Sequence, residues 1–459
     1  MSTRIEKKEV NMLSGSIMKG LFRISIPIMI MNVVMTIFNI VDMTVLRIFD
    51  TGNGFAVGSV GACGTLITLI TGLLIGCSAG SNVVIAKYIG MNEPEKVERA
   101  TGVSILFSFV GGLVLGIIGI CFAKVFLSWT NCPTELMDGA ALYFRLYFVG
   151  LPILMVYNFA AAILRATGNS RGPMIYLIVG SAVKLAANVL FVGIFKLAVA
   201  GVAYATLLSW VVMTYLALRA LIKTRGATRL KLSRLRFYGS ELKEVLRLGV
   251  PAGLQQGLYS IANVIIATTV NAFGAEASTG ISIANNFDGV LYQIVTAAPL
   301  AVLPYVSQNI GAGNFSRARR AVLNGMIITI ALGASFGALS AIFSSQLSSL
   351  MSSNPAVIAY SRQKMIIVSS TYFICGINNI LGEALRGMGR PNFSAVTTLL
   401  YMCAFRFVWV YAIFPLVPNF TFLYLVWPIG WILSIITLLP FYFKTFRRLE
   451  ATHLLKKNT

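Results

Sequence analysis

Charged residues are scarce in this sequence: they make up 11% of its 459 residues, against 57% hydrophobic residues, and the mean hydropathy is +0.80. A water-soluble globular domain carries far more charge than this, so that class of protein is excluded. Histidine is nearly absent too, because His453 in the polar C-terminal tail is the single one. An active site built on histidine is therefore excluded.

Cysteine and acidic residues are also few. The six cysteines show no CxxC spacing, so we expect neither a disulfide framework nor a metal site. The sequence has 15 acidic and 37 basic residues, which give a net charge of +22. Nucleic-acid binding is not indicated, because the basic residues are spread over short connections and do not form one patch. The polar first fifteen residues predict no cleavable signal peptide.

What the sequence does contain is a series of apolar runs long enough to cross a bilayer, which takes about 20 helical residues. We expect an all-α polytopic membrane protein with twelve transmembrane helices. The runs are 21–46, 55–86, 101–128, 140–164, 173–195, 198–222, 246–273, 278–310, 321–345, 356–385, 392–416 and 422–443.

Lysine and arginine predict the orientation. With the N-terminus in the cytoplasm, 28 of them fall in inner segments and six in outer ones. Such a bias is the positive-inside signal, so both termini are expected in the cytoplasm. The most basic connection, residues 223–244, would lie near anionic headgroups.

The two halves on either side of this connection repeat each other. Gly90 corresponds to Gly311, and Arg165 to Arg386, at the same offset along the chain. An even number of helices in each half gives both halves one orientation, so a two-fold axis along the membrane normal is expected, with a cavity between the halves. The predicted domains are a tail (1–20), a six-helix lobe (21–222), the basic linker (223–244), a second six-helix lobe (245–445) and a tail (446–459).

The first apolar run contains one carboxylate, Asp42, fifteen residues after Pro27. An ionisable group inside a membrane span is costly and marks a pathway or coupling site by default. The alternative is a carboxylate at the membrane edge. Asn188 lies fifteen residues after Pro173, at the same depth, so a shared site is feasible.

Lys184 lies one turn before Asn188 on the same helix face. A buried lysine needs a carboxylate, and Asp42 is the only one in the spans of this half, so Lys184 is a candidate counter-ion for Asp42. The alternative is that Lys184 extends to the interface. With Asn39, these residues form the predicted cation-coupling site.

The twelve runs, Ser307–Gly313 (SQNIGAG) and the two LR(A/G)xG motifs resemble the multidrug and toxic compound extrusion (MATE) family over nearly the whole chain. FNIVD, which ends at Asp42, resembles its DinF-like bacterial branch. The resemblance implies an exporter of organic, usually cationic, compounds driven by H⁺ or Na⁺, with Asp42 as the coupling carboxylate and Asn188 beside it. The chain departs from the family pattern at Val192, where an aspartate is common, and at Gln255 and Gln256, where some branches have a glutamate. Both departures weaken a sodium site at Asp42.

The second half has its own polar groups. Arg406 occupies the depth of Asn188 in the repeat, and an Asp288–Arg406 ion pair is predicted, with two separate groups facing water as the alternative. Glu383 lies near Arg386. We interpret it as part of a salt bridge at the membrane boundary, in preference to a role in substrate binding. Pro27 and Pro251 are expected to bend their helices. Seven further polar residues line the cavity or bond between helices, two roles that the sequence does not separate: Gln255, Gln256, Asn263, Tyr157, Asn158, Asn378 and Asn379.

These observations favour a secondary antiporter in the plasma or inner membrane, working as a monomer with H⁺ or Na⁺ and no other cofactor. The alternative is a flippase of the same superfamily for a lipid-linked oligosaccharide or another amphipathic anion. An enzyme is not expected, because HExxH, GxSxG and paired aspartates are missing from the runs.

Overall fold

The computed structural model describes residues 10–49, 55–130, 132–224, 226–231, 233 and 235–458. Within its helices, the side chains of residues 39–43, 46–47, 55–57, 62, 65, 258–261, 264 and 456–458 lie outside that description. Helices make up the regular structure of the described ranges, which contain no strand. The all-helical prediction is therefore confirmed.

The chain divides into two compact units, unit 1 (residues 1–10 and 33–253) and unit 2 (residues 11–32 and 254–459). Helices α1 (Ile17–Phe49) and α9 (Gly239–Asn271) each contribute to both units. Unit 1 otherwise contains α2 (Phe55–Gly90), α3 (Pro94–Cys121), α4 (Ala123–Trp129), α5 (Thr134–Val149), α6 (Leu151–Ala166), α7 (Arg171–Asn188), the π-helix η1 (Val189–Ile194) and α8 (Ala198–Lys223).

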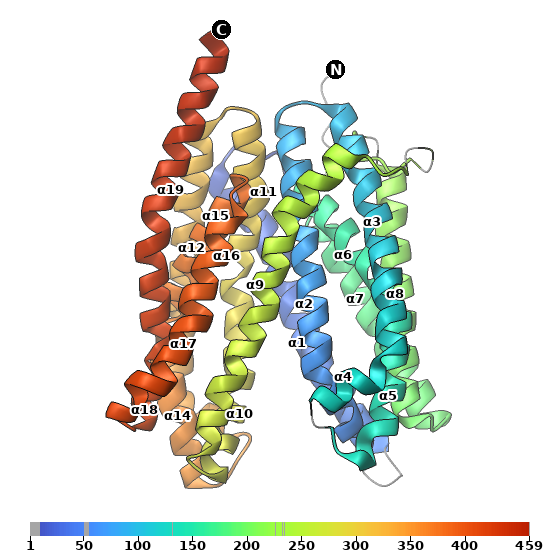
Figure 1. Ribbon diagram of the computed structural model, residues 1–459, viewed down its shortest axis with the longest axis vertical. Helices are drawn as coiled ribbons and strands as arrows, with labels where there is room; N and C mark the ends of the chain where they lie inside the picture. Colours follow the sequence, from blue (N-terminus) through green and yellow to red (C-terminus); the bar gives the residue numbers. More distant parts are fainter. Residues whose placement is uncertain are drawn as a thin grey trace. The chain divides into compact units, whose positions relative to one another are not determined.

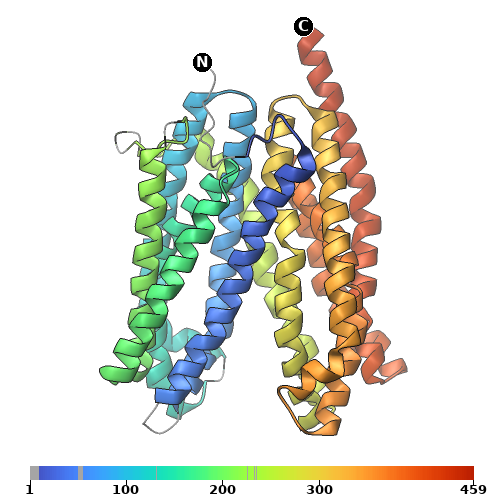
Figure 2. The same ribbon diagram turned by 180° about the vertical axis from the view of Figure 1, so that it is seen from behind.

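Unit 2 has a similar succession of helices, and within each unit, taken by itself, the long helices run roughly side by side (Figures 1 and 2). Its elements are α10 (Ala275–Val295), α11 (Ala297–Gly311), α12 (Phe315–Ile342), α13 (Ser344–Ser349), α14 (Pro355–Ser370), α15 (Tyr372–Gly387), α16 (Pro391–Thr398), η3 (Leu399–Ala404), α17 (Phe405–Val408), η4 (Trp409–Ile413), η5 (Phe414–Leu416), α18 (Phe420–Tyr424) and α19 (Val426–Asn458).

The expected transmembrane runs coincide with these helices. In the described part of the chain, nine helices are long and apolar enough to cross a membrane, or up to eleven if each of two bent pairs is one span. The pairs are α5–α6, bent by 47°, and α14–α15, bent by 45°. The seventh expected run lies on α9. The protein is therefore a polytopic membrane protein with two helical lobes.

The boundary between the units falls inside α1, after Asn32, and inside α9, after Gly253. Each boundary follows the proline that the sequence predicts as a bend, since Pro27 lies inside α1 and Pro251 inside α9. A proline removes one backbone donor from its helix and so weakens it locally. The first part of α1 thus packs with the second half of the chain, and the first part of α9 with the first half.

Glycines allow α9 to approach α2 closely within unit 1. A Cβ atom on Gly80 would lie 2.3 Å from the Val245 carbonyl oxygen, and one on Gly76 would lie 2.4 Å from Gly253 Cα. Gly249 is packed as tightly, against the backbone of Cys77. Small residues four apart on both helices are the usual way for helices in membranes to bring their backbones into contact.

The start of α9 is also held by charge. Glu244 accepts hydrogen bonds from Lys87 Nζ at 2.7 Å and from the Tyr88 hydroxyl at 2.5 Å. Burial raises the pKa of Glu244, but these two bonds and the charges of Lys87 and Lys96 outweigh it, so the pKa lies below its ordinary value. The carboxylate is therefore the form that fixes α9 to the end of α2.

Arg317, in the first turn of α12, holds the first described segment of the chain in unit 2. Its guanidinium donates to three carbonyl oxygens within Met12–Gly15 at 2.6–2.9 Å. Nearby, Arg319 lies 3.7 Å from Glu450 near the end of α19. Residues 12–15 and the last part of α19 therefore lie at the same end of unit 2, beside the start of α12.

Candidate functional site

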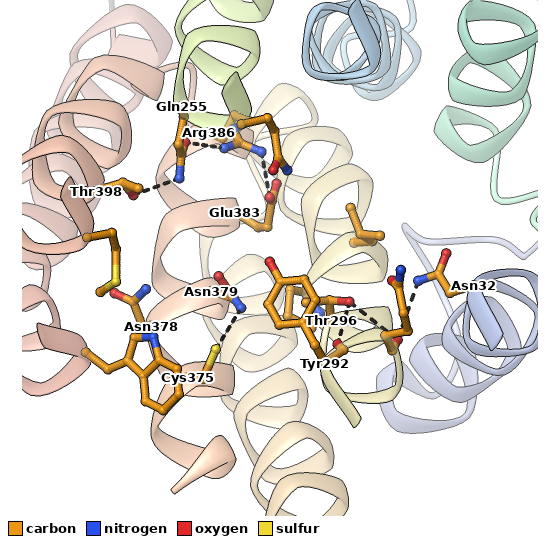
Figure 3. Close-up of a pocket in the computed structure, with 16 residues that line it drawn as sticks. Asn32, Gln255, Tyr292, Thr296, Cys375, Asn378, Asn379, Glu383, Arg386 and Thr398 are labelled. Carbon is orange, nitrogen blue, oxygen red and sulfur yellow. Dashed lines mark hydrogen bonds and ion pairs between the residues drawn. The ribbon is translucent and has the colours of Figure 1, made fainter. Parts of the chain in front are cut away.

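Unit 2 contains a polar cavity of about 200 Å³. Amide, hydroxyl and aromatic side chains face it, together with one acidic and one basic group (Figure 3). They come from the first part of α1, from α9, α10, α11, α15, α16, η3 and α19, and from the α10–α11 junction. The lining residues are Asn32, Gln255, Gln256, Tyr292, Gln293, Thr296, Pro299, Leu300, Cys375, Asn378, Asn379, Glu383, Arg386, Thr398, Met402 and Trp431.

One wall of the cavity is a continuous chain of hydrogen bonds across three helices (Figure 3). Glu383 Oε1 lies 2.6 Å from Arg386 Nη1 on the same helix, and Arg386 Nη2 donates to Gln255 Oε1 at 2.8 Å. Gln255 Nε2 in turn donates to Thr398 Oγ1 at 2.7 Å. The acidic and basic side chains are 13% and 9% exposed, so this pair is nearly buried. Its charges cancel, and the wall carries no net charge.

The opposite wall is made of amides and aromatic rings. Asn378 Oδ1 accepts a hydrogen bond from Ser434 at 2.5 Å, and the Asn379 amide donates to Cys375 Sγ at 3.5 Å. Tyr292 and Trp431 line the same space. Such a surface suits a flat, partly polar organic molecule, which can stack on the rings and exchange hydrogen bonds with the amides.

The polar residues predicted for this half divide into two groups. Gln255, Gln256, Asn378 and Asn379 lie in the cavity wall. The others lie outside it, in two clusters that the sequence did not separate: Asn263, Asp288 and Arg406.

The predicted Asp288–Arg406 ion pair is wrong. Asp288 Oδ2 lies 2.9 Å from the ammonium of Lys364 on α14, and both side chains are buried. Depth along the helices matched Asp288 with Arg406, but the number of residues from a helix end does not fix the face on which a side chain lies. Lys364 lies in the interior of α14.

Arg406 belongs to the second cluster. Its Nη1 atom donates to Asn263 Oδ1 at 2.6 Å, and its guanidinium lies 4.8 Å from the centre of the Trp427 ring. At 1% exposure it is one of the most deeply buried side chains in the protein. A guanidinium over an aromatic face is stabilised by the ring quadrupole, the more so away from water.

In unit 1, the predicted cavity residues of α6 bond to helices instead. The Tyr157 hydroxyl donates to the carbonyl of Pro173 on α7 at 3.2 Å, and the Asn158 amide donates to Leu154 in its own helix at 2.9 Å. Of the two roles left open for these residues, the described geometry supports bonding within the helix bundle.

The predicted coupling site falls partly outside the described residues. Asn39 and Asp42 lie on α1, but their side chains are not among those that the structure describes. Asn188 is completely buried at the end of α7, and Lys184, one turn earlier, is half-buried. The pairing of Lys184 with Asp42 stays a prediction.

Two features of the site were missed. Glu383 and Arg386 form the predicted salt bridge, but it lies in the cavity wall, and the LR(A/G)xG motif that contains Arg386 was a signal for it. The π-helical turns were not foreseen: η1 directly follows Asn188, and η4 begins three residues after Arg406. Such wide turns are frequent at functional sites, and no local sequence pattern predicts them.

Comparisons with known proteins agree with this architecture. A family model described as MatE matches the chain twice, over residues 27–190 and 251–412. The chain belongs to the MatE family. The two matches fall on the two halves that the internal repeat predicts.

Relatives of this MatE protein span nearly its whole length. The probable multidrug resistance protein YoeA of Bacillus subtilis is 26% identical over 395 residues, which cover 84% of either chain. A FAD transporter of Shewanella oneidensis is 24% identical and covers 86% of this chain and 87% of its own. The crystal structure of a MATE protein in the straight conformation matches 98% of this chain and 100% of its own, with a TM-score of 0.89 at 21% identity. This MatE protein is therefore a multi-pass membrane transporter and not an enzyme.

Proposed function

We propose that this protein is a secondary antiporter, which exports lipophilic organic cations in exchange for H⁺ or Na⁺. Its two halves would expose the substrate path alternately to either side of the membrane. Each ligand would shift that balance only by its different affinity for the two states. The family assignment supports transport, and the substrate, the coupling ion and the mechanism are our proposal.

The observation that carries the proposal is the polar cavity of unit 2. Unsatisfied polar groups inside a membrane are costly, so a cavity lined by amides, hydroxyls and an ion pair within apolar helices marks a binding site. The rings of Tyr292 and Trp431 favour a flat cation over a flat neutral molecule of the same size.

Coupling is assigned to Asp42, with Asn39, Asn188 and Lys184 as its neighbours in the first half. A proton or a sodium ion bound at Asp42 would be released as the substrate path changes sides. Lys184 would neutralise the carboxylate when no ion is bound. Replacing Lys184 with Met tests this role, and an unchanged pH dependence of transport would reject it.

The proposal is tested by flux of a fluorescent lipophilic cation in proteoliposomes with an imposed pH or sodium gradient. Asp42→Asn is expected to abolish gradient-driven flux. Asp138→Asn is the matched control, because Asp138 is 92% exposed and pairs with Lys124 at the surface. Flux of the cation that is insensitive to both gradients in the wild type would refute antiport.

A second candidate is a flippase or exporter for an amphipathic anion, such as a lipid-linked oligosaccharide. The relative named as a FAD transporter favours it, because FAD is a large anion with a flat aromatic part. Arg386 in the cavity wall could meet such an anion, but Glu383 already neutralises it. Counterflow of FAD or of a lipid-linked glycan, without counterflow of cations, would replace the first candidate by the second.

The remaining assignments follow from the sequence. The distribution of lysine and arginine supports a location in the plasma or inner membrane with both termini in the cytoplasm. A monomer suffices, since each half would complete the other. Protease accessibility of the C-terminal tail in oriented vesicles would test the orientation.

A further inference from the structure

The buried ion pair of Asp288 and Lys364 has no part in the proposal above. Lys364 is 4% exposed and Asp288 is 8% exposed, and the two atoms Nζ and Oδ2 lie 2.9 Å apart. Taking both charges out of water costs several kcal/mol per ion, and a well-packed apolar pair would often be as stable. Stability alone is therefore a poor reason for this pair.

The groups around the ammonium are those that recognise an organic cation. Lys364 Nζ contacts a carboxylate oxygen of Asp288 and the amide oxygen of Asn285, and it lies 5.8 Å from the centre of the Tyr424 ring. A carboxylate, an amide oxygen and an aromatic face together bind ammonium groups in many proteins. Here the bound ammonium is the side chain of Lys364 itself.

The carboxylate is positioned by other groups than Lys364. Ser369 Oγ donates to Asp288 Oδ1 at 2.9 Å, and the Tyr372 hydroxyl donates to the backbone carbonyl of Asp288 at 3.4 Å. Within the described part of the chain, Asp288 Oδ2 and the Tyr424 hydroxyl are buried without a well-directed hydrogen bond. The carboxylate would therefore stay in place, and keep bonding capacity, if the lysine moved.

The ion pair lies next to the cavity. Tyr292, which lines the cavity, follows Asp288 by one turn on the same face of α10. Tyr372, which bonds to Asp288, packs against the cavity residue Trp431 with ring centres 5.6 Å apart. Asn285, whose amide oxygen contacts the Lys364 ammonium, is exposed. A molecule with its ring at Tyr292 could place an ammonium at Asp288, which lies one turn, roughly 6 Å, closer to the start of α10.

From this geometry we infer that Asp288, Asn285 and Tyr424 form a binding site for the ammonium group of an aromatic amine. Lys364 occupies this site until the substrate displaces it. The inference rests on the proposed export of organic cations, and it names their chemical class and a second contact point. Lys364 acts as an internal competitor, so a molecule without a positive charge would not displace it.

Binding to the full-length protein in nanodiscs tests the inference without any gradient. The probe is 3-phenylpropylammonium, and the neutral control is 3-phenyl-1-propanol. Removing the competitor with Lys364→Met is expected to lower the Kd for the ammonium at least about tenfold, because the free site is no longer a minor state. The Kd for the alcohol should not change. Arg362→Met, an exposed position on the same helix, is the control variant and should leave both values unchanged.

A double variant, Asp288→Asn with Lys364→Met, should lose the gain, because no carboxylate remains for the ammonium. An unchanged Kd in Lys364→Met, or a gain that persists in the double variant, would show that the pair is only structural. If Lys364→Met does not fold, the wild type decides. Labelling of Lys364 by an amine-reactive reagent should rise with saturating (3-phenylpropyl)trimethylammonium, whose quaternary nitrogen does not react with the reagent, and not with the alcohol. Equal labelling would overturn the inference.

If the wild type transports no cation but Lys364→Met still lowers the Kd for the ammonium probe, the antiporter is refuted and the ammonium site is supported. Transport of cations without a shift in Kd would do the opposite. The two proposals therefore fail by different measurements.

Discussion

Replacing Arg386 with Met would break the cavity wall at its centre. Arg386 neutralises Glu383 and holds Gln255, so the variant leaves a carboxylate in the wall without its partner. Removing one partner of a buried ion pair typically costs 3–5 kcal/mol. The cavity leaves some exposure to both side chains, so we expect the lower end of that range, about 3 kcal/mol of unfolding free energy.

The partner change, Glu383→Gln, should cost about as much, because it leaves an uncompensated guanidinium. Making both changes removes both charges, and the remaining loss is the hydrogen bond to Gln255, worth about 1 kcal/mol. The double variant is therefore expected to be more stable than either single one. This non-additive result is the signature of a coupled pair.

The assay is reversible unfolding in mixed micelles, read by tryptophan fluorescence, for the wild type and the three variants. Arg390→Met is the matched control, since Arg390 makes no ion pair among the described residues, and it should cost less than about 1 kcal/mol. If the losses of the two single variants simply add in the double variant, Glu383 and Arg386 do not stabilise one another, and the description of a neutral wall fails.

Three further predictions concern contacts between helices and at helix starts. Gly80→Ala should destabilise unit 1 by at least about 2 kcal/mol, because the new Cβ would overlap the backbone of α9. Gly64→Ala, on the same helix, meets open space and should leave stability unchanged. Thermal unfolding of both variants checks this. Glu244 has a lowered pKa, so the stabilisation that its carboxylate gives is present above the ordinary pKa and is lost as the pH falls through the lowered value. The melting temperatures of the wild type and of Glu244→Gln should therefore converge in acid. A difference that stays constant with pH would contradict this. Arg317→Ala should speed amide exchange in the first described segment, while Arg320→Ala, whose residue bonds only within its own helix, should not.

The sequence predicted the helices better than it predicted their contacts. Apolar runs and the spacing of Lys and Arg follow directly from the bilayer, and the duplicated motifs follow from a repeated unit, so the fold class and the internal repeat could be derived. Side-chain partners could not, because a helix at a known depth can still present any face. Asp288 shows this, since its depth agreed with Arg406 while its face meets Lys364.

The division of α1 and α9 between the two units could not be predicted from the sequence either. The polar linker at residues 223–244 predicts that each lobe is one continuous stretch of chain, and this stays a prediction. Within unit 1, the first part of α9 packs with the first half through glycines whose partners lie far away in sequence. The pattern Gly76–Gly80 is visible in the sequence, but a small-residue pair does not name its partner helix.

Charge around the cavity of unit 2 is balanced in two separate pairs, Glu383 with Arg386 in the wall and Asp288 with Lys364 one turn beyond it. A charged substrate entering a space with no net charge gains little from it unless one internal partner gives way. Each cation has two acceptors, but the guanidinium is a rigid planar fork, whereas the lysine is a flexible chain with a compact charge. Selectivity for cations would then come from the group that can leave, and a cavity that is neutral at rest would still discriminate by charge.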